Sequence, residues 1–307
     1  MNVSKNLNIF QVIESNFKNN FDKLGGKQFH FTSRLFLWKN DKFSRQSLLK
    51  LKDKYIGRNS EECSAKIIQI LNRKTTYTNC LFYELRKKYF IKYPLLRKYK
   101  KILFKYLFSK TIYGIDIRHV IESLISDQKF LKLKNELEND HDAITILSTH
   151  AINFFYSLDF YMDSPKDLIK PNFFLRIVEE NAPYMGEHNI GLLVYLLTHC
   201  IVGESAFYSR PINRELDIYI KMFYLAEKII LNWFDKLSLD ILLEFLVCAR
   251  ICGVKTKLRQ KIITAAEDNF IPKYGYIVES TDSIHHRLKF TKTEHRNVLA
   301  IMVMSHR

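Results

Sequence analysis

The most constraining feature of this sequence is a short phrase that occurs three times in its second half. Each copy opens with an acidic residue and a histidine, continues through an apolar run, and closes with a hydroxyl residue and a histidine. The opening pairs are Asp140-His141, Glu187-His188 and Glu294-His295, and the closing pairs are Thr149-His150, Thr198-His199 and Ser305-His306. The two histidines have the same spacing in the second and third copies, so we interpret the phrase as a structural repeat.

The intervals between the copies predict helical hairpins. The closing histidines of the first two copies are about one hairpin length apart, and the next interval is about twice as long, which leaves room for a missing copy. The helix expected at Ser238–Cys252 fills this gap, with Cys248 or Cys252 in the place of the closing histidine. Hairpins at a fixed period stack into a solenoid or close into a ring.

Helix signals dominate the whole chain, and strand signals are nearly absent apart from a weak alternation at Phe29–Leu37. The expected fold class is therefore all-α, with stacked antiparallel helical hairpins and a second half that is toroid-like or solenoid-like. We expect a basic helical part over residues 1–139 and the hairpin repeats over residues 140–307, joined as one continuous compact unit. The helices are expected at Val3–Asp22, Ser44–Lys54, Glu61–Asn72, Thr78–Phe90, Pro94–Ser109, Arg118–Glu138, His141–Leu158, Asp167–Glu179, His188–Val202, Arg214–Trp233, Ser238–Cys252, Lys257–Asp268 and Thr293–His306.

The positive charge of the chain is confined to its first half. Residues 1–139 contain 29 Lys and Arg against 12 Asp and Glu, whereas residues 140–307 contain 19 against 20. The densest part is the segment Arg86–Lys110, which we call the basic strip, where lysines and arginines alternate with tyrosines and phenylalanines. A strip of this kind binds the phosphates of a nucleic acid and stacks its bases, holds an acidic peptide or lies on an anionic membrane. Alternatively, it is a solvated helix face whose aromatic residues belong to the core.

Three cations of the basic strip are candidate ligand-binding residues, namely Arg97, Lys98 and Lys101. The repeated phrase adds His141 and His188 to this group. If the helices that carry the phrase run parallel, their first turns meet at one pole, where free N–H groups and the helix dipole favour an anion.

The closing residues of the phrase define a possible metal site at the opposite pole. Imidazole and thiolate are ligands that zinc and iron accept, so His150, His199 and Cys248 are the candidate ligands. The same residues also have a purely structural explanation, because acids stabilise helix starts and a histidine near a helix end bonds free carbonyl groups.

The polar segment that follows His199 is the candidate reactive loop. It runs from Gly203 to Pro211 and contains Glu204, Tyr208 and Arg210. Loops on a rigid scaffold commonly carry chemistry, and an acid–base mechanism needs a histidine or a carboxylate in a pocket. We therefore name His199, His295 and Glu204 as candidate catalytic residues, and Tyr208 and Arg210 as candidate substrate-binding residues. The long connection Pro272–Lys292 is either a lid or an ordinary surface loop.

The remaining sequence features restrict the class of protein. No apolar stretch is long and uncharged enough to span a membrane, and the first residues lack the pattern of a secretory signal. Five cysteines without a Cys-x-x-Cys pair indicate reduced thiols, so a cytoplasmic location is expected. Heavy use of Lys, Asn and Ile favours an AT-rich, bacterial genome. Phosphate-binding and nucleophile-elbow motifs are missing from the sequence.

The second half of the chain resembles the α/α-toroid proteins, the class of helical-hairpin scaffolds that includes terpenoid cyclases, protein prenyltransferase subunits and lanthionine cyclases. The resemblance covers residues 140–307 and depends on the repeated phrase, its period and the helix-ending segment Glu267–Pro272. The Asp-rich motifs of terpenoid cyclases and the Cys-His-Gly triplet of lanthionine cyclases are missing, so no catalytic role is carried over. The resemblance implies a central cavity lined by inner helices.

Two functions follow as hypotheses. The first is an enzyme or accessory protein that binds a peptide or a small anionic metabolite in a cavity rimmed by histidines, in bacterial specialised metabolism. The second is a non-catalytic protein that binds nucleic acid or an acidic peptide through the basic strip. A scaffold with purely structural histidines is the third interpretation. Zinc or iron is the cofactor considered, and the sequence does not fix the oligomeric state.

Overall fold

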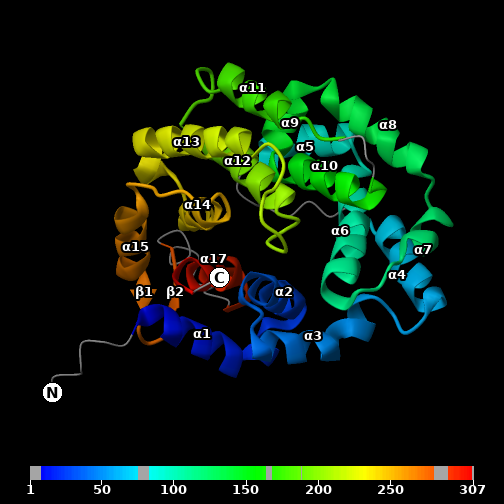
Figure 1. Cartoon of the computed structure of the whole chain (residues 1–307), viewed down its shortest axis with the longest axis horizontal. Helices are drawn as coiled ribbons and strands as arrows, with labels where there is room; N and C mark the ends of the chain where they lie inside the picture. Colours follow the sequence, from blue (N-terminus) through cyan, green and yellow to red (C-terminus); the bar gives the residue numbers. More distant parts are fainter. Residues whose placement is uncertain (1–7, 75–82, 164–167, 188, 280–289, 306–307) are drawn as a thin grey trace. The chain divides into compact units, whose positions relative to one another are not determined.

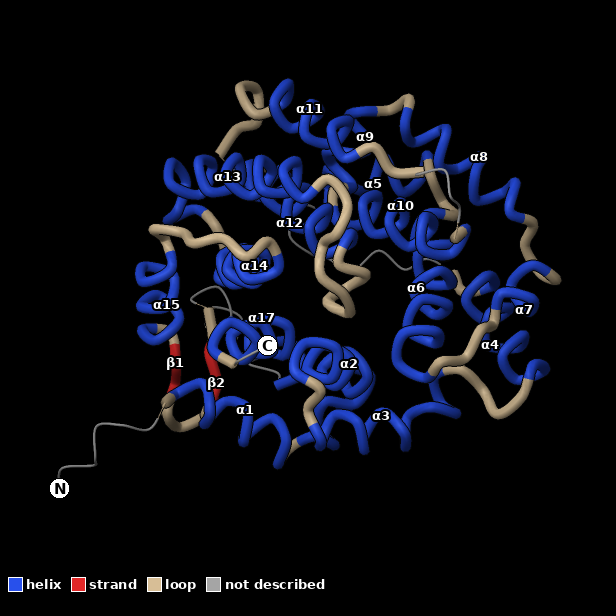
Figure 2. Tube along the Cα trace, in the orientation of Figure 1, coloured by secondary structure: helices blue, strands red, loops and turns tan. Residues whose placement is uncertain are grey.

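The computed structural model describes residues 8–74, 83–163, 168–187, 189–279 and 290–305. Within these residues the chain is all-α, and its regular strand structure is one two-stranded hairpin (Figures 1 and 2). The all-α prediction is therefore confirmed. The chain forms two compact units, of which unit 1 contains residues 1–50 and 227–307 and unit 2 contains residues 51–226. The boundary near residue 139 that the sequence suggested lies within unit 2.

Unit 1 is built around its C-terminal helix. Its helices are α1 (Ile9–Asn19), the 3-10 helix η1 (Phe21–Lys27), α2 (Gln28–Lys39), η2 (Phe234–Lys236), α14 (Leu239–Ile251), α15 (Arg259–Asp268) and α17 (Phe290–Met304), and the antiparallel strands are β1 (Phe270–Ile271) and β2 (Tyr276–Ile277). Helix α17 packs against α1, α2, α14 and β2. All residues of α17 from Thr293 to Val303 except His295 are buried, so the helix is the core of the unit.

Unit 2 is centred on α10, which packs against both α6 and α12 (Figure 1). Its helices are α4 (Ser60–Asn72), α5 (Tyr83–Lys92), α6 (Leu96–Tyr113), α7 (Arg118–Glu122), α8 (Asp127–Glu138), α9 (His141–Leu147), α10 (Thr149–Met162), α11 (Pro171–Asn181) and α12 (Ile190–Glu204). Helix α4 packs against α6, and α5 packs against α9. The boundaries between the units fall within α3 (Lys42–Tyr55) and α13 (Leu216–Trp233).

Several segments differ from the helices that the sequence predicts. The single helix expected at Arg118–Glu138 is divided into α7 and α8. Phe29–Leu37, with its weak alternation, lies inside α2, because the buried residues Phe31, Leu35 and Trp38 follow helical spacing. The helix expected at His141–Leu158 is divided at Ser148, whose φ is 42° and whose hydroxyl donates a hydrogen bond to the carbonyl of Leu192 in α12. This contact fixes the break between α9 and α10.

The copies of the repeated phrase occupy different places in their helices. His141 is the first residue of α9, and His150 is the second residue of α10, so the first copy spans two helices. His199 lies well inside α12, and Glu294-His295 lies inside α17 rather than at its start. The helix of the third copy thus begins at Phe290, three residues before the expected start at Thr293.

Candidate anion-binding site

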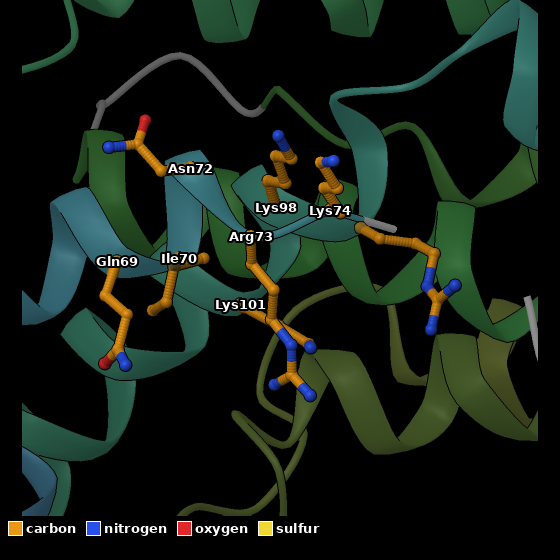
Figure 3. Close-up of a pocket in the computed structure, with 8 residues that line it drawn as sticks. Gln69, Ile70, Asn72, Arg73, Lys74, Lys98 and Lys101 are labelled. Carbon is orange, nitrogen blue, oxygen red and sulfur yellow. The ribbon is translucent and has the colours of Figure 1, made fainter. Parts of the chain in front are cut away.

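The basic strip contributes to a pocket between the end of α4 and the first turns of α6, which we call the α4–α6 pocket. It has a volume of about 660 Å³, and no carboxylate is found among its described lining residues, which are Gln69, Ile70, Asn72, Arg73, Lys74, Arg97, Lys98 and Lys101. The close-up in Figure 3 shows Arg73 and Lys101 pointing in one direction, and Lys74 and Lys98 pointing together in another. Three of the predicted ligand-binding residues thus line one pocket.

Local sequence explains why the cations meet there. Helix α4 ends at Asn72, and the extended backbone of Arg73 directs the chain away from the helix axis. Helix α6 has no acidic residue in its first turn, although the positive end of a helix dipole favours one. The spacing of Arg97, Lys98 and Lys101 brings all three toward one side of α6. The dipole and the side chains therefore add positive potential at the same place.

The charges of the pocket repel one another. Burial and the neighbouring guanidinium groups of Arg73 and Arg97 lower the pKa of Lys101. Lys98 donates a hydrogen bond through Nζ to the carbonyl of Leu71 in the last turn of α4, which holds its ammonium group at the pocket. The guanidinium carbon of Arg97 lies 5.3 Å from the ring centre of Phe90. An anion in this pocket would relieve the repulsion.

The aromatic residues of the basic strip mostly belong to the core. Phe90, Tyr93, Tyr99 and Tyr106 are no more than 6% exposed. They cannot serve as platforms on which bases stack, so the interpretation of these four aromatics as core residues is confirmed. Arg97, Lys98 and Lys101 are more accessible to a ligand than these four rings.

A second group of basic side chains consists of Lys100, which lies three residues after Arg97 in α6, and His150. Nζ of Lys100 is 3.0 Å from Nδ1 of His150, at the start of α10. Burial lowers the pKa of Lys100 to about 7, together with the charges of Arg97, Lys101 and Arg86. Burial and the same kind of cationic neighbours hold the pKa of His150 well below its ordinary value. His150 is therefore neutral at physiological pH.

Glu204 belongs to a buried polar network rather than to an open loop. Its carboxylate is 3.1 Å from Nη2 of Arg214 and accepts a hydrogen bond from the hydroxyl of Tyr219. Arg214 also pairs with Asp159, and the hydroxyl of Tyr219 lies 3.0 Å from that of Tyr156. A carboxylate so fully engaged holds α12 to its neighbours, and the catalytic role of Glu204 stays a prediction.

The turn after α12 has an unusual backbone. Ala206, Phe207 and Tyr208 are consecutive residues with positive φ, at 45°, 54° and 77°. Ser205 holds this left-handed turn, because its Oγ accepts a hydrogen bond from the amide of Tyr208. Tyr208 is buried, whereas Arg210 is exposed with a guanidinium nitrogen 3.9 Å from Glu204. The two predicted substrate-binding residues of this loop therefore face different surroundings.

The predicted histidines have separate environments. Nδ1 of His199 is 2.6 Å from Oδ1 of Asn153 in α10. His141 is exposed, and its ring lies edge-on to Phe173 at 5.3 Å. His188 lies outside the described residues, as do His306 and residues 280–289 of the predicted lid. The structure does not bring these histidines to one described site.

His295 is part of an acid–histidine pair in unit 1. Its Nδ1 is 2.7 Å from Oδ1 of Asp240, and its Nε2 is 4.0 Å from Oε2 of Glu244. Burial alone would raise the pKa of Asp240, but the hydrogen bond to His295 and the guanidinium of Arg296 outweigh it and bring that pKa to about 2. Asp240 thus orients the imidazole, an arrangement that general bases use. The catalytic role of His295 stays a prediction.

A metal centre finds no support in the described part of the chain. There, no group of three or more His, Cys, Asp and Glu side chains is placed to hold a metal ion. Cys248, a proposed ligand, is fully buried among the apolar residues of α14. His150 and His199 bond instead to Lys100 and Asn153, as described above.

Sequence reasoning missed two of the five cations that line the α4–α6 pocket. Arg73 and Lys74 precede the basic strip, and only the packing of α4 on α6 brings them to it. It also missed Asp240 as the partner of His295, which is 55 residues away along the chain. For the pocket, the sequence signal is the absence of an acidic residue from the first turn of α6, which leaves the positive end of the helix dipole without a counter-charge.

Comparison with known proteins gives no assignment. No family model, no curated protein and no solved structure matches this chain. None of the helices in the described residues is long and apolar enough to cross a membrane.

Proposed function

We propose that this protein binds a small phosphate-bearing anion in the α4–α6 pocket, as an accessory or ligand-binding protein. The observation that carries the proposal is the composition of the pocket, where five cations and no described carboxylate surround a space of about 660 Å³. Charged hydrogen bonds from lysine and arginine to phosphate oxygens are among the strongest that proteins make. The size suits a small ligand, since ligand pockets generally measure about 300–1,000 Å³.

The electrostatics of the pocket support a ligand with more than one negative charge. Burial and the positive charges of Arg73 and Arg97 lower the pKa of Lys101, and no carboxylate is found among the described residues that line the pocket. A dianion placed between these groups would exchange repulsion for attraction. The cations line a concave site instead of lying on an open helix face, which supports a binding role over a merely solvated face.

Nucleic acid is the other source of phosphate, and the structure favours it less. Single-strand binding proteins combine a cationic groove with exposed aromatic rings, whereas four rings of the basic strip are buried here. A small anion uses the cations alone. The experiment below distinguishes the two ligands.

The test is a calorimetric titration with sodium pyrophosphate, run in parallel with fluorescence anisotropy of a labelled single-stranded oligonucleotide. The pocket variant is Lys98→Gln with Lys101→Gln. Its matched control is Lys129→Gln with Lys132→Gln, which removes two exposed charges at the same spacing on α8. We expect the pocket variant to weaken pyrophosphate binding by about tenfold or more, and the control to leave it unchanged.

Two results would count against the proposal. The first is a wild-type protein that shows no saturable heat with pyrophosphate. The second is an oligonucleotide that binds more tightly than pyrophosphate and loses affinity equally in both variants, because such behaviour indicates diffuse attraction to the basic surface.

A further inference from the structure

Lys100 and His150 form a pair of basic side chains in unit 2. Lys100 lies in α6 with its side chain partly buried, and its Nζ is 3.0 Å from Nδ1 of His150. The charged groups that act on Lys100 are Arg97, Lys101 and Arg86, which are all cations. Burial and neighbouring positive charges therefore favour the neutral amine form of Lys100 over its ammonium form.

His150 completes the arrangement. Its ring is packed edge-on against Phe90, with the centroids 5.0 Å apart, so the imidazole is held in place. Because His150 is neutral, its Nδ1 accepts a hydrogen bond from Nζ of Lys100. When Lys100 is a neutral amine, neither side chain of the pair carries a charge. This is the combination of nucleophile and adjacent base that covalent catalysis requires.

The pair lies next to the α4–α6 pocket. Arg97 lines that pocket, and the ring of Phe90 contacts both the guanidinium of Arg97, at 5.3 Å, and the imidazole of His150, at 5.0 Å. A ligand anchored through a phosphate near Arg97 would extend its other end along the same helix. The two sites therefore point to a ligand that carries both a phosphate and an electrophilic carbon.

We propose that Lys100 is a nucleophilic amine that condenses with the carbonyl group of a phosphorylated aldehyde or ketone held in the α4–α6 pocket. The inference depends on the proposed function for its anchoring group. The lone pair of Nζ attacks the carbonyl carbon, and His150 carries the first of the two amine protons from the nitrogen to the carbonyl oxygen, which gives a neutral carbinolamine. His150 removes a proton from the nitrogen and returns it to the departing hydroxyl group. One water molecule leaves and an imine forms, with no oxidant or reductant required.

Lys105 and Lys92, two other lysines of the basic strip, differ from Lys100 in their partners. Lys105 is also buried, which lowers its pKa to about 8, but its Nζ donates to the carbonyl of Tyr55 and lies 4.4 Å from the centre of that ring. Lys92 is exposed, and its Nζ is 2.6 Å from Asp140, which raises its pKa. Lys100 is thus distinguished by a basic rather than an acidic or carbonyl partner.

The experiment uses pyridoxal 5′-phosphate as a probe, because this molecule carries both an aldehyde and a phosphate. The full chain is incubated with the probe at pH 7, reduced with sodium borohydride and mapped by peptide mass spectrometry. We expect labelling of Lys100 about tenfold or more faster than that of Lys92, since a larger fraction of Lys100 is the free amine. Lys100→Arg should abolish the principal adduct, and Lys92→Arg should not.

His150→Gln keeps a hydrogen-bond acceptor but not a base, so it should slow labelling of Lys100 without moving the adduct elsewhere. Its circular dichroism spectrum controls for folding. Adducts spread over the exposed lysines of α5 and unchanged in Lys100→Arg would overturn the inference.

Pyridoxal without the phosphate separates this inference from the proposed function. If both aldehydes label Lys100 equally, the amine is reactive but the pocket does not anchor the phosphate, and the proposed function fails. If pyrophosphate binds in the pocket and neither aldehyde labels Lys100, the proposed function stands and the inference fails.

Discussion

Arg214 pairs with Glu204 inside unit 2, with Nη2 of the guanidinium 3.1 Å from Oε2 of the carboxylate. The side chain of Glu204 is only 4% exposed, so its carboxylate charge would be costly to bury without the guanidinium of Arg214 beside it. Glu204→Gln should lower the free energy of unfolding by about 2 kcal/mol, because Arg214 and the buried hydroxyl of Tyr219 lose a charged acceptor. Urea denaturation measures this change. The exposed Glu136→Gln on α8 is the control and should change stability by less than about 0.5 kcal/mol.

Gly203 allows α12 to approach the ring of Tyr156. A Cβ atom at residue 203 would lie 2.5 Å from Cγ of that ring, well inside contact distance. Gly203→Ala should therefore destabilise the protein by about 1–3 kcal/mol, although alanine is normally the better helix residue. The melting temperature of the variant checks this. Gly26→Ala is the control and should have the melting temperature of the wild type, because nothing lies within 4 Å of the added atom. A Gly203→Ala variant that is more stable than the wild type would contradict the described packing.

The Asp240–His295 pair is expected to stabilise unit 1 whether or not it takes part in catalysis. Asp240→Asn should lower the free energy of unfolding by about 1.5–3 kcal/mol, since His295 and Arg296 both lose a charged acceptor. The pKa of Asp240 is near 2 in the folded protein, so this contribution is present above the ordinary aspartate value and is lost as the pH falls through 2. Stability curves of the two proteins should converge in strong acid. Curves that stay parallel would show that the charge of Asp240 is unimportant.

The Lys100–His150 pair gives the stability of the protein a specific pH dependence. Lys100 has a folded pKa of about 7, below its ordinary value of 10.5, so between these pH values the unfolded chain holds a proton that the folded chain lacks. The contribution of Lys100 to the free energy of unfolding therefore increases as the pH rises above 7. His150 acts in the same sense at lower pH, because its folded pKa is depressed and stability falls as the pH drops below about 6.5.

Lys100→Met should flatten the rise in unfolding free energy between pH 7 and pH 9, and His150→Gln should flatten the loss between pH 6.5 and pH 5. Urea denaturation at each pH measures both slopes. A Lys100→Met protein that keeps the wild-type slope would show that Lys100 remains protonated in the fold.

The helices were predictable where apolar spacing is regular. Helix α4 was expected at Glu61–Asn72 and is found at Ser60–Asn72, and α14 was expected at Ser238–Cys252 and is found at Leu239–Ile251. The break at Ser148 was not predictable, because it depends on a hydrogen bond to Leu192 that only the packing of α12 creates. The break divides the first copy of the phrase between two helices, whereas the apolar runs of the later copies each lie in one helix.

The candidate site was partly visible in the sequence. Arg97, Lys98 and Lys101 were identified from charge density alone, and they do share a pocket. The partners that give this pocket its character, Arg73 and Lys74, belong to a different helix end and become neighbours through the contact of α4 with α6. The sequence reports local charge, whereas a pocket requires residues from separate helices.

The most direct test of the anion site is the unfolding free energy of Lys101→Glu, measured in urea with and without pyrophosphate. Lys101 is repelled by Arg73 and Arg97, so a negative charge there should leave the free protein as stable as the wild type or more stable by about 0.5 kcal/mol. Pyrophosphate at 100 times its dissociation constant should stabilise the wild type by about 2.7 kcal/mol and the variant hardly at all. A variant that is less stable alone, or one that pyrophosphate stabilises as much as it does the wild type, would contradict the account.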